Sequence, residues 1–180
     1  MEPAIDDAYL VRRAREGYLD AYQVLVERHG PRAYRVALRL LGNREDAEDV
    51  TQDALLAAWQ ALPTFRAESS FATWLYRIVT TRALNKSTRT ARTETLNAMP
   101  EPADPAHGPA EQAEQDLIAA AVTEAIDALP TAQRLALILH QFEGLSYSEI
   151  AEITGSTVAA VRSHLYRARR TLATTLQDWR

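Results

Sequence analysis

The sequence predicts an all-α protein of two small helical domains, an N-terminal helical bundle and a C-terminal helix-turn-helix, joined by a flexible acidic linker that contains proline. Apolar residues recur at three- and four-residue spacing through most of the 180 residues, and no segment shows the alternation of a strand. Residues 93–114 hold several prolines and few large apolar residues, a composition that cannot bury enough surface to fold. We therefore expect domains over 1–92 and 115–180 and a linker over 93–114.

Five helices are expected in the N-terminal domain. Glycine and proline mark their ends, because glycine favours helix termini and proline favours the first helical turn. Gly17 and Gly30 are expected to end the first two helices, and Pro31 to open the third. The serines before Phe71 can cap the fifth. The expected spans are 6–16, 19–29, Arg32 to Leu41, Arg44 to Leu62, and Phe71 to about Arg89.

In the C-terminal domain, a helical pattern resumes near Gln115, and Pro130 opens a second helix. A tight pair of helices follows. Ser146 and Glu149 have the spacing of a capping box, which satisfies backbone donors at a helix start. Gly155 can end that helix in the left-handed conformation, and Ser156 or Thr157 can cap the next one.

The last helix of this pair has one apolar stripe and one basic face. The stripe is formed by Val158, Val161, Leu165, Ala168 and Leu172. The opposite face carries Arg162, Ser163, His164, Tyr166, Arg167, Arg169 and Arg170. A helix-turn-helix places its second helix in the DNA major groove, and these side chains can donate to base edges and phosphates. The alternative is a helical hairpin whose basic face is merely solvated.

The net charge of −4 hides a strong pattern. Residues 77–93 hold five basic side chains and no acidic one, whereas residues 94–127 hold eight acidic side chains and no lysine or arginine. Basic residues again dominate 156–180. Two basic regions separated by an acidic connector are typical of a protein that binds nucleic acid through separate surfaces.

Several function classes are excluded by composition. There is no cysteine, so disulfides and thiolate chemistry are ruled out, and the four histidines show no metal-ligand spacing. No apolar run approaches the length of a membrane span, and the acidic N-terminus is unlike a signal peptide, so we expect a cytoplasmic protein without membrane insertion. No phosphate loop, nucleophile elbow or catalytic triad motif is present, so we expect no enzyme activity and no cofactor.

An acidic cluster on the fourth expected helix allows three interpretations. Asp46, Asp49 and Asp53 lie at i, i+3 and i+7, on one helix face. Such carboxylates can hold a divalent metal for nuclease chemistry, although the companion residues of such a site are missing. The face can also be merely solvated, or it can dock a basic partner protein.

Aromatic and basic residues alternate around the start of the fifth expected helix. Trp74, Leu75 and Ile78 are expected to face the core, whereas Phe65, in a polar loop, is not. Aromatic rings beside cations suit stacking on unpaired bases while the cations hold phosphates. The candidate residues of this surface are Phe65, Arg66, Ser69, Ser70, Trp74, Arg77, Thr81, Asn85 and Lys86.

Taken together, these motifs resemble the extracytoplasmic-function (ECF) class of bacterial RNA polymerase sigma factors. The resemblance runs from about Tyr9 to Leu176, apart from the linker, and depends on three blocks in order. They are Asp46-Ala-Glu-Asp-Val-Thr-Gln-Asp53, the segment from Phe65 to Ile78, and Gly144-Leu-Ser-Tyr-Ser-Glu-Ile-Ala151 with Val161 to Arg169. One block alone would not be specific, but all three in this order are.

The resemblance implies a promoter-specificity subunit that binds core polymerase, recognises the −35 and −10 elements and promotes melting. It implies contacts of the acidic helix with the clamp of the largest subunit through Asp46, Asp49, Gln52 and Asp53. The second block is similar to the loop that captures a flipped −10 base, and unstacking that base costs a few kcal/mol. The −35 element would be read by Thr157, Arg162, Ser163, His164, Tyr166, Arg167 and Arg170. Further implied partners are the flap of the second-largest subunit and an anti-sigma protein.

Two positions depart from the family pattern. Arginine often stands where this chain has His164, and asparagine often stands where it has Thr81. The promoter consensus therefore cannot be transferred from relatives. The runner-up hypothesis is a free-standing helix-turn-helix regulator with an N-terminal sensing or dimerisation domain, which would leave the acidic helix and the Phe65 loop without a role.

Overall fold

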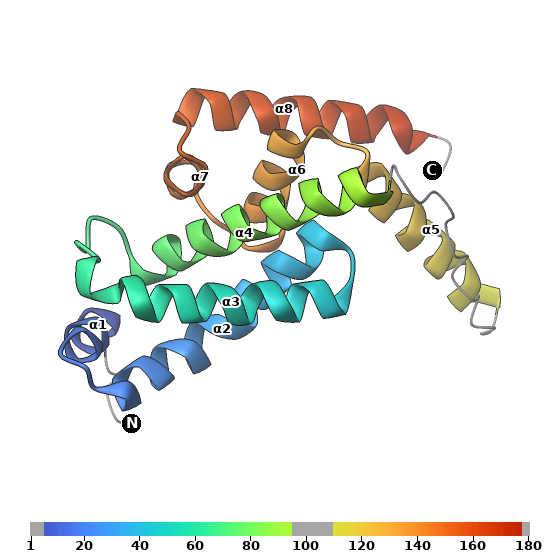
Figure 1. Ribbon diagram of the computed structural model, residues 1–180. Helices are drawn as coiled ribbons and strands as arrows, with labels where there is room; N and C mark the ends of the chain where they lie inside the picture. Colours follow the sequence, from blue (N-terminus) through green and yellow to red (C-terminus); the bar gives the residue numbers. More distant parts are fainter. Residues whose placement is uncertain (1–5, 95–109, 178–180) are drawn as a thin grey trace.

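The computed structural model describes residues 6–94 and 110–177, with side chains over 6–89 and 117–177, and this part of the chain contains helices and no strands. The first half forms α1 (Asp7–Arg15), α2 (Leu19–Leu41), α3 (Arg44–Ala61), the short 3₁₀ helix η1 (Leu62–Thr64) and α4 (Phe71–Glu94). The second half forms α5 (Ala110–Asp127), α6 (Thr131–Leu137), the π-helical turn η2 (Ile138–Phe142), α7 (Tyr147–Thr154) and α8 (Val158–Thr175) (Figure 1). The all-α prediction is confirmed, while most of the expected linker lies outside the described residues.

The N-terminal bundle packs α2, α3 and α4 against one another, with α1 across the start of α2. The predicted break at Gly30 and Pro31 is wrong, because α2 runs through both residues as one helix. Proline in a helix interior removes one backbone hydrogen bond. The helix continues because Leu25 and Val36, on either side of the break, are both fully buried in the same core. Tertiary packing therefore outweighs the local signal.

Side-chain caps begin both α3 and α4, although only the serine cap of α4 was predicted from the sequence. The Asn43 side chain accepts a hydrogen bond from the Asp46 backbone N–H (2.8 Å) at the start of α3. Ser70 accepts from the Thr73 N–H (3.0 Å) at the start of α4, as expected of a serine there. Helix α4 extends five residues beyond the expected end near Arg89, to Glu94. The first C-terminal helix likewise begins at Ala110 and not near Gln115.

The helix-turn-helix forms as predicted. Ser146 and Glu149 make a complete capping box at the start of α7, and Gly155 ends the helix with a left-handed φ of 63°. Thr157, one of the two candidate caps, accepts from the Ala160 N–H (3.1 Å) at the start of α8. Val161, Leu165 and Ala168 of the predicted stripe are buried, so α8 is anchored with its basic side facing outward.

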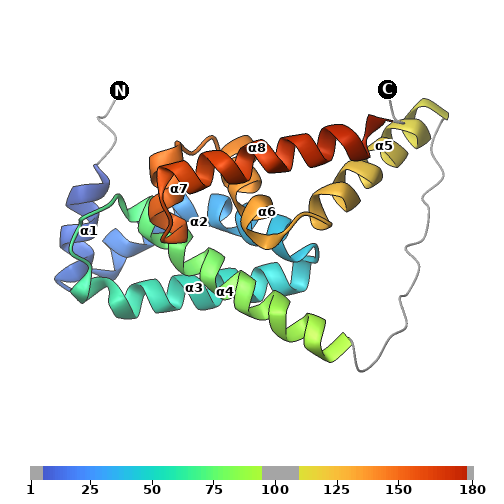
Figure 2. The ribbon, with the colours of Figure 1, turned by 90° about the horizontal axis from the view of Figure 1, so that it is seen from above.

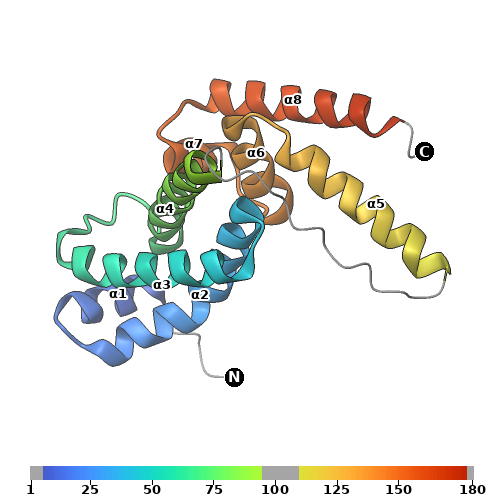
Figure 3. The same cartoon turned by 45° about the vertical axis from the view of Figure 1, so that its right-hand side comes forward.

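The two halves pack on each other through α4 and α7. Figures 2 and 3 show α4 passing beneath α6 and α7, with α8 on the far side of them and α5 projecting away from the bundle. Buried residues of both halves, including Tyr76, Val79, Ile138 and Ile150, belong to one continuous apolar cluster. Among the described residues, no helix combines the length and the apolar character needed to cross a bilayer.

Candidate nucleic-acid interface

Helix α8 presents a basic face to solvent. Arg162, Tyr166, Arg167 and Arg170 are exposed, with 65% of Tyr166 accessible. Arg167 is held in place by hydrogen bonds to Ser163 Oγ (2.5 Å) and His164 Nδ1 (3.1 Å). The rigid helix thus carries guanidinium groups on the side opposite its buried stripe, the arrangement in which a recognition helix reaches base edges and phosphates.

His164, like Ser163, is less exposed than the arginines of this face. It lies at the edge of the buried stripe, is half-buried, and lines a cavity together with Val161 of α8 and Thr80, Thr81 and Leu84 of α4. His164 thus lies at the edge of the basic face, with its Nδ1 3.1 Å from an Arg167 guanidinium nitrogen. The reason is its position, because it falls between the exposed arginines and the side of α8 that packs inward.

A groove between α3 and α4 collects four of the residues predicted for the −10 surface: Trp74, Arg77, Thr81 and Asn85. Its volume is about 580 Å³, and Ala57 and Ala61 of α3 leave room on the opposite wall. Arg77 and Asn85 are exposed, and Trp74 is half-buried with one side open to the groove. An indole wall beside a cation and an amide is suited to an unpaired base and its phosphate.

Phe65 does not behave as the sequence analysis expects. Its side chain is buried, with 6% exposed, and its ring lies 4.6 Å from that of Trp74 between centroids. Trp74 in turn contacts Phe71, at 5.9 Å. An aromatic residue in a polar loop becomes part of the core here because the loop folds back over the start of α4. Phe65 thereby supports Trp74, while Arg66 and Ser70 stay at the surface.

Lys86 of α4 pairs with two carboxylates of the acidic helix α3. Lys86 Nζ lies 2.6 Å from Asp46 Oδ1 and 3.3 Å from Asp49 Oδ2. Hydrogen bonds from the Asn43 amide and then from Lys86 lower the pKa of Asp46, and Asp46 raises the pKa of Lys86. The remaining predicted contacts, Gln52 and Asp53, are exposed on α3.

This pairing weakens the metal interpretation. The ammonium of Lys86 lies between the two carboxylates where a cation would have to bind. Within residues 6–89 and 117–177, no three His, Cys, Asp or Glu side chains are grouped to hold a metal ion. The acidic face is therefore better suited to contact with a protein than to divalent-metal chemistry.

Comparison with known proteins identifies the family. Residues 25–93 match the model of Sigma-70 region 2, and residues 119–172 match that of Sigma-70 region 4. The RNA polymerase sigma-H factor of Pseudomonas aeruginosa is 35% identical over 95% of this chain and 94% of its own length. The ECF RNA polymerase sigma-E factor of Escherichia coli K12 is 31% identical over 98% of this chain and 97% of its own length.

The chain belongs to the ECF sigma factors of RNA polymerase. It is a promoter-specificity subunit that binds core polymerase and promoter DNA, and sigma factors are transcription initiation factors without catalytic activity of their own. The regulator hypothesis is not favoured, because the N-terminal half matches sigma region 2.

Solved structures agree with this assignment. This sigma factor is similar to CnrH in its complex with the cytosolic domain of CnrY, with a TM-score of 0.72, 28% identity, and coverage of 96% of this chain and 97% of that one. It is also similar to RpoE bound to the anti-sigma factor NepR from Bartonella quintana, with a TM-score of 0.68, 25% identity, and coverage of 87% and 96%. Both neighbours are bound to a protein partner, which for the sigma factor RpoE is an anti-sigma factor.

The sequence analysis missed one prominent polar contact of this sigma factor. Glu143, just after η2, is buried with its side chain 1% exposed, and it pairs with Arg32 (2.9 Å) and Arg39 (3.0 Å) of α2. No local motif could have indicated it, because the partners are more than a hundred residues apart in sequence. The sequence shows only that an acidic residue, Glu143, precedes Gly144.

Proposed function

We propose that this sigma factor uses three surfaces, one for each partner of transcription initiation. The groove between α3 and α4 would take the −10 element, the exposed face of α8 would read the −35 element, and the acidic face of α3 would dock on the clamp of the largest polymerase subunit. The gathering of Trp74, Arg77, Thr81 and Asn85 around one groove is the observation that carries the proposal.

In the −10 surface, we infer that a base of the melted strand enters the groove. Stacking on an aromatic side chain is worth about 1–3 kcal/mol per base, enough to offset part of the cost of unstacking. Trp74 would supply the stacking wall, and Phe65 behind it would hold that wall in place. The strand or its backbone would be contacted by the remaining residues of this surface: Arg66, Ser69, Ser70, Arg77, Thr81, Asn85 and Lys86.

In the −35 surface, α8 would lie in the major groove. Arg162 and Arg167 would donate to base edges, with Ser163 and His164 beside them, while Thr157, Tyr166 and Arg170 would hold the phosphates. The same C-terminal unit would contact the flap of the second-largest subunit. In the proposed division, residues 1–92 bind core polymerase and recognise and melt the −10 element, and residues 115–180 recognise the −35 element. Residues 93–114 are the linker between them.

For the core polymerase, Asp46, Asp49, Gln52 and Asp53 would meet basic groups of the clamp. We infer a cytoplasmic site of action, where core polymerase and the chromosome are found, and no enzyme activity of the chain itself. CnrH and RpoE are each seen with a protein partner, and RpoE with an anti-sigma factor. We therefore infer that an anti-sigma protein also regulates this chain.

Run-off transcription tests the proposal directly. Purified bacterial core polymerase is combined with the chain on a library of upstream fragments from its own genome. We expect transcripts that depend on the factor from a few fragments that share two spaced elements. A chain that neither binds core polymerase nor starts any transcript, while still binding duplex DNA, would instead be a free-standing regulator.

A further inference from the structure

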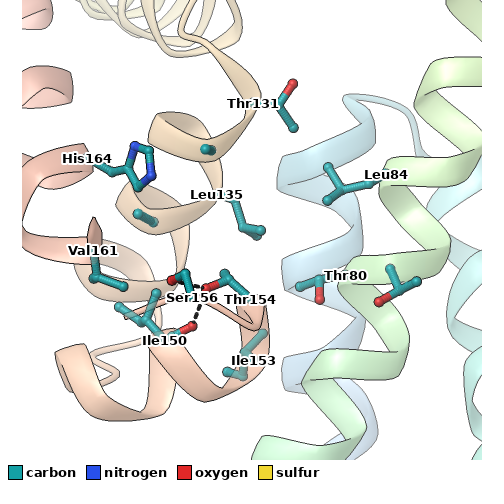
Figure 4. Close-up of a pocket in the computed structure, with 13 residues that line it drawn as sticks. Thr80, Leu84, Thr131, Leu135, Ile150, Ile153, Thr154, Ser156, Val161 and His164 are labelled. Atoms are coloured by element: carbon teal, nitrogen blue, oxygen red, sulfur yellow. Dashed lines mark hydrogen bonds between the residues drawn. The ribbon is translucent and has the colours of Figure 1, made fainter. Parts of the chain in front are cut away.

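One cavity separates residues assigned to two different promoter elements. It measures about 340 Å³ and lies between α4 and the C-terminal helices α6, α7 and α8. Figure 4 shows Thr80 and Leu84 of α4 on one side and Leu135, Ile153 and His164 on the other. Thr81, proposed for the −10 element, and His164, proposed for the −35 element, both line it.

This arrangement cannot be the one that binds a promoter. The −35 and −10 elements are separate segments of the duplex, so residues that read them cannot face each other across one small cavity. If the proposed surfaces are right, the two halves must move apart before both can contact DNA.

A cluster of ion pairs around the buried Glu143 connects the two halves. Glu143 Oε2 accepts a hydrogen bond from Arg32 Nε (2.9 Å), and Glu143 Oε1 accepts one from an Arg39 guanidinium nitrogen (3.0 Å). A third guanidinium, that of Arg35, lies 4.0 Å from Oε2. Arg32 also donates to the Glu143 backbone carbonyl. The three arginines lie at i, i+3 and i+7, along one side of α2.

The cluster has the properties of a releasable contact. A carboxylate buried as deeply as that of Glu143 is stable only while it is paired, so the pairing favours the closed arrangement. The side chains of Arg32, Arg35 and Arg39, in contrast, are 40%, 50% and 34% exposed, so water and competing anions can reach them. The contact is thus made by a carboxylate that is buried in the closed state, while its arginine partners stay accessible to competing anions.

We propose that Glu143, with Arg32, Arg35 and Arg39, forms a latch that holds the chain closed until core polymerase or DNA separates its halves. The inference rests on the proposed function, because the closed state matters only if α4 and α8 bind separate promoter elements. Only open molecules bind both elements, so the latch lowers the apparent affinity of the free chain for DNA in proportion to the fraction that is open. It thereby limits promoter binding by chains that have no polymerase.

The test measures the distance between the halves in the full chain without polymerase. Because the chain has no cysteine, Gln60→Cys in α3 and Thr171→Cys in α8 create two unique positions for spin labels, both exposed and outside the proposed surfaces. We expect one narrow distance distribution for the parent chain. Glu143→Gln should shift it to longer, broader distances. Affinity for a duplex with the −35 element found by run-off transcription should rise about tenfold if the open fraction grows from one-tenth to near unity.

Three further variants make the outcome decisive. Glu152→Gln removes the same charge from an exposed position of α7 and should leave the distances unchanged. The double variant Arg32→Gln/Arg39→Gln changes two side chains of α2, both of which are partly exposed. It should open the chain as Glu143→Gln does. Adding Glu143→Gln to that pair should have no further effect. If Glu143→Gln fails to fold, by circular dichroism, the arginine pair decides alone.

The latch is refuted if the arginine pair or a folded Glu143→Gln keeps the parent distances, or if Glu152→Gln opens the chain equally. Run-off transcription by the same proteins separates this result from a failure of the proposed function. A parent chain that starts no transcript refutes the function, whatever the distances show. Normal transcripts from a chain whose distances never respond to these substitutions refute the latch alone.

Discussion

The two buried tyrosines of the N-terminal bundle differ in one hydrogen bond. The Tyr22 hydroxyl donates to the Leu55 carbonyl at 2.6 Å, whereas the fully buried Tyr76 hydroxyl has no hydrogen-bond partner among the described residues. Burial raises the pKa of each to about 12. The Tyr76 ring lies under the Arg32 guanidinium, 5.8 Å from its centroid, so its position is set by packing and not by its oxygen.

Phenylalanine substitutions therefore form a matched pair. We expect Tyr22→Phe to lower the free energy of unfolding by about 1 kcal/mol, because it removes a satisfied bond. Tyr76→Phe should be neutral or raise that free energy by up to about 1 kcal/mol, since it removes a buried group without a partner. Urea unfolding of both proteins measures the difference. Equal losses would mean that the Tyr76 hydroxyl is satisfied in solution.

Arg162 is the residue whose removal tests base reading most directly. It is exposed on α8, near the N-terminal end that a recognition helix directs to the bases. We expect Arg162→Ala to weaken binding of the −35 element by about 1–3 kcal/mol and to relax specificity at one base pair. Binding of the polymerase holoenzyme to single-base variants of the element measures this. A uniform loss over all variants would assign Arg162 to a phosphate instead.

At the scale of helices, glycine has opposite roles in α2 and after α7. Gly30 lies inside α2, and a Cβ there would meet Val26 and Leu55 at 3.8 and 3.9 Å, an ordinary contact. Gly155 has a φ of +63°, which side chains disfavour. We expect Gly30→Ala to raise the free energy of unfolding by about 0.5–1 kcal/mol. Gly155→Ala should lower it by about 1–2 kcal/mol. Thermal unfolding of the two variants checks both signs.

The capping box of α7 makes the helix-turn-helix sensitive to acid. Hydrogen bonds from the Ser146 hydroxyl and backbone N–H hold the pKa of Glu149 below its ordinary value of 4.5. A depressed pKa stabilises the fold above that ordinary value, and this stabilisation is lost as the pH falls through the folded-state pKa.

Glu149→Gln separates the charge from the hydrogen bonds, because glutamine can also complete a capping box. We expect the parent chain to lose stability more steeply than Glu149→Gln as the pH falls below 4.5, the ordinary pKa of this carboxyl. Urea unfolding at several pH values provides the measurement. Parallel curves for the two proteins would show that Glu149 does not contribute to the acid transition.

At the scale of the whole molecule, Lys86 connects two proposed interfaces. It pairs with Asp46 and Asp49, which we assign to polymerase docking, while it also stands beside the proposed −10 groove. Basic groups of the clamp would compete with Lys86 for the same carboxylates. Docking and DNA contact are thus linked by charge as well as by geometry.

Charge reversal at Asp49 tests the docking surface. We expect Asp49→Lys to weaken binding to core polymerase at least about tenfold, because like charges at an interface cost several kcal/mol and about 1.4 kcal/mol is tenfold in affinity. Glu27→Lys, an equal change at an exposed position of α2, should leave core affinity unchanged. Fluorescence titration with core polymerase measures both. Unchanged affinity in Asp49→Lys would remove α3 from the interface.

The sequence by itself determined the all-α class, the caps of α4, α7 and α8, and the family. These features depend on contacts within a few residues, such as Ser146 with Glu149, or on motifs read in order along the chain. The exposed basic face of α8 was likewise predictable, because a helix with one buried stripe exposes the opposite face.

Only the tertiary structure decided the rest. It showed that α2 continues through Pro31, that Phe65 is buried against Trp74, and that Glu143 pairs with arginines of the other half. The physical reason is the same in each case: burial against distant residues outweighs a local preference of a few kcal/mol at most. Which distant residues meet is a property of packing, and no spacing along the chain records it.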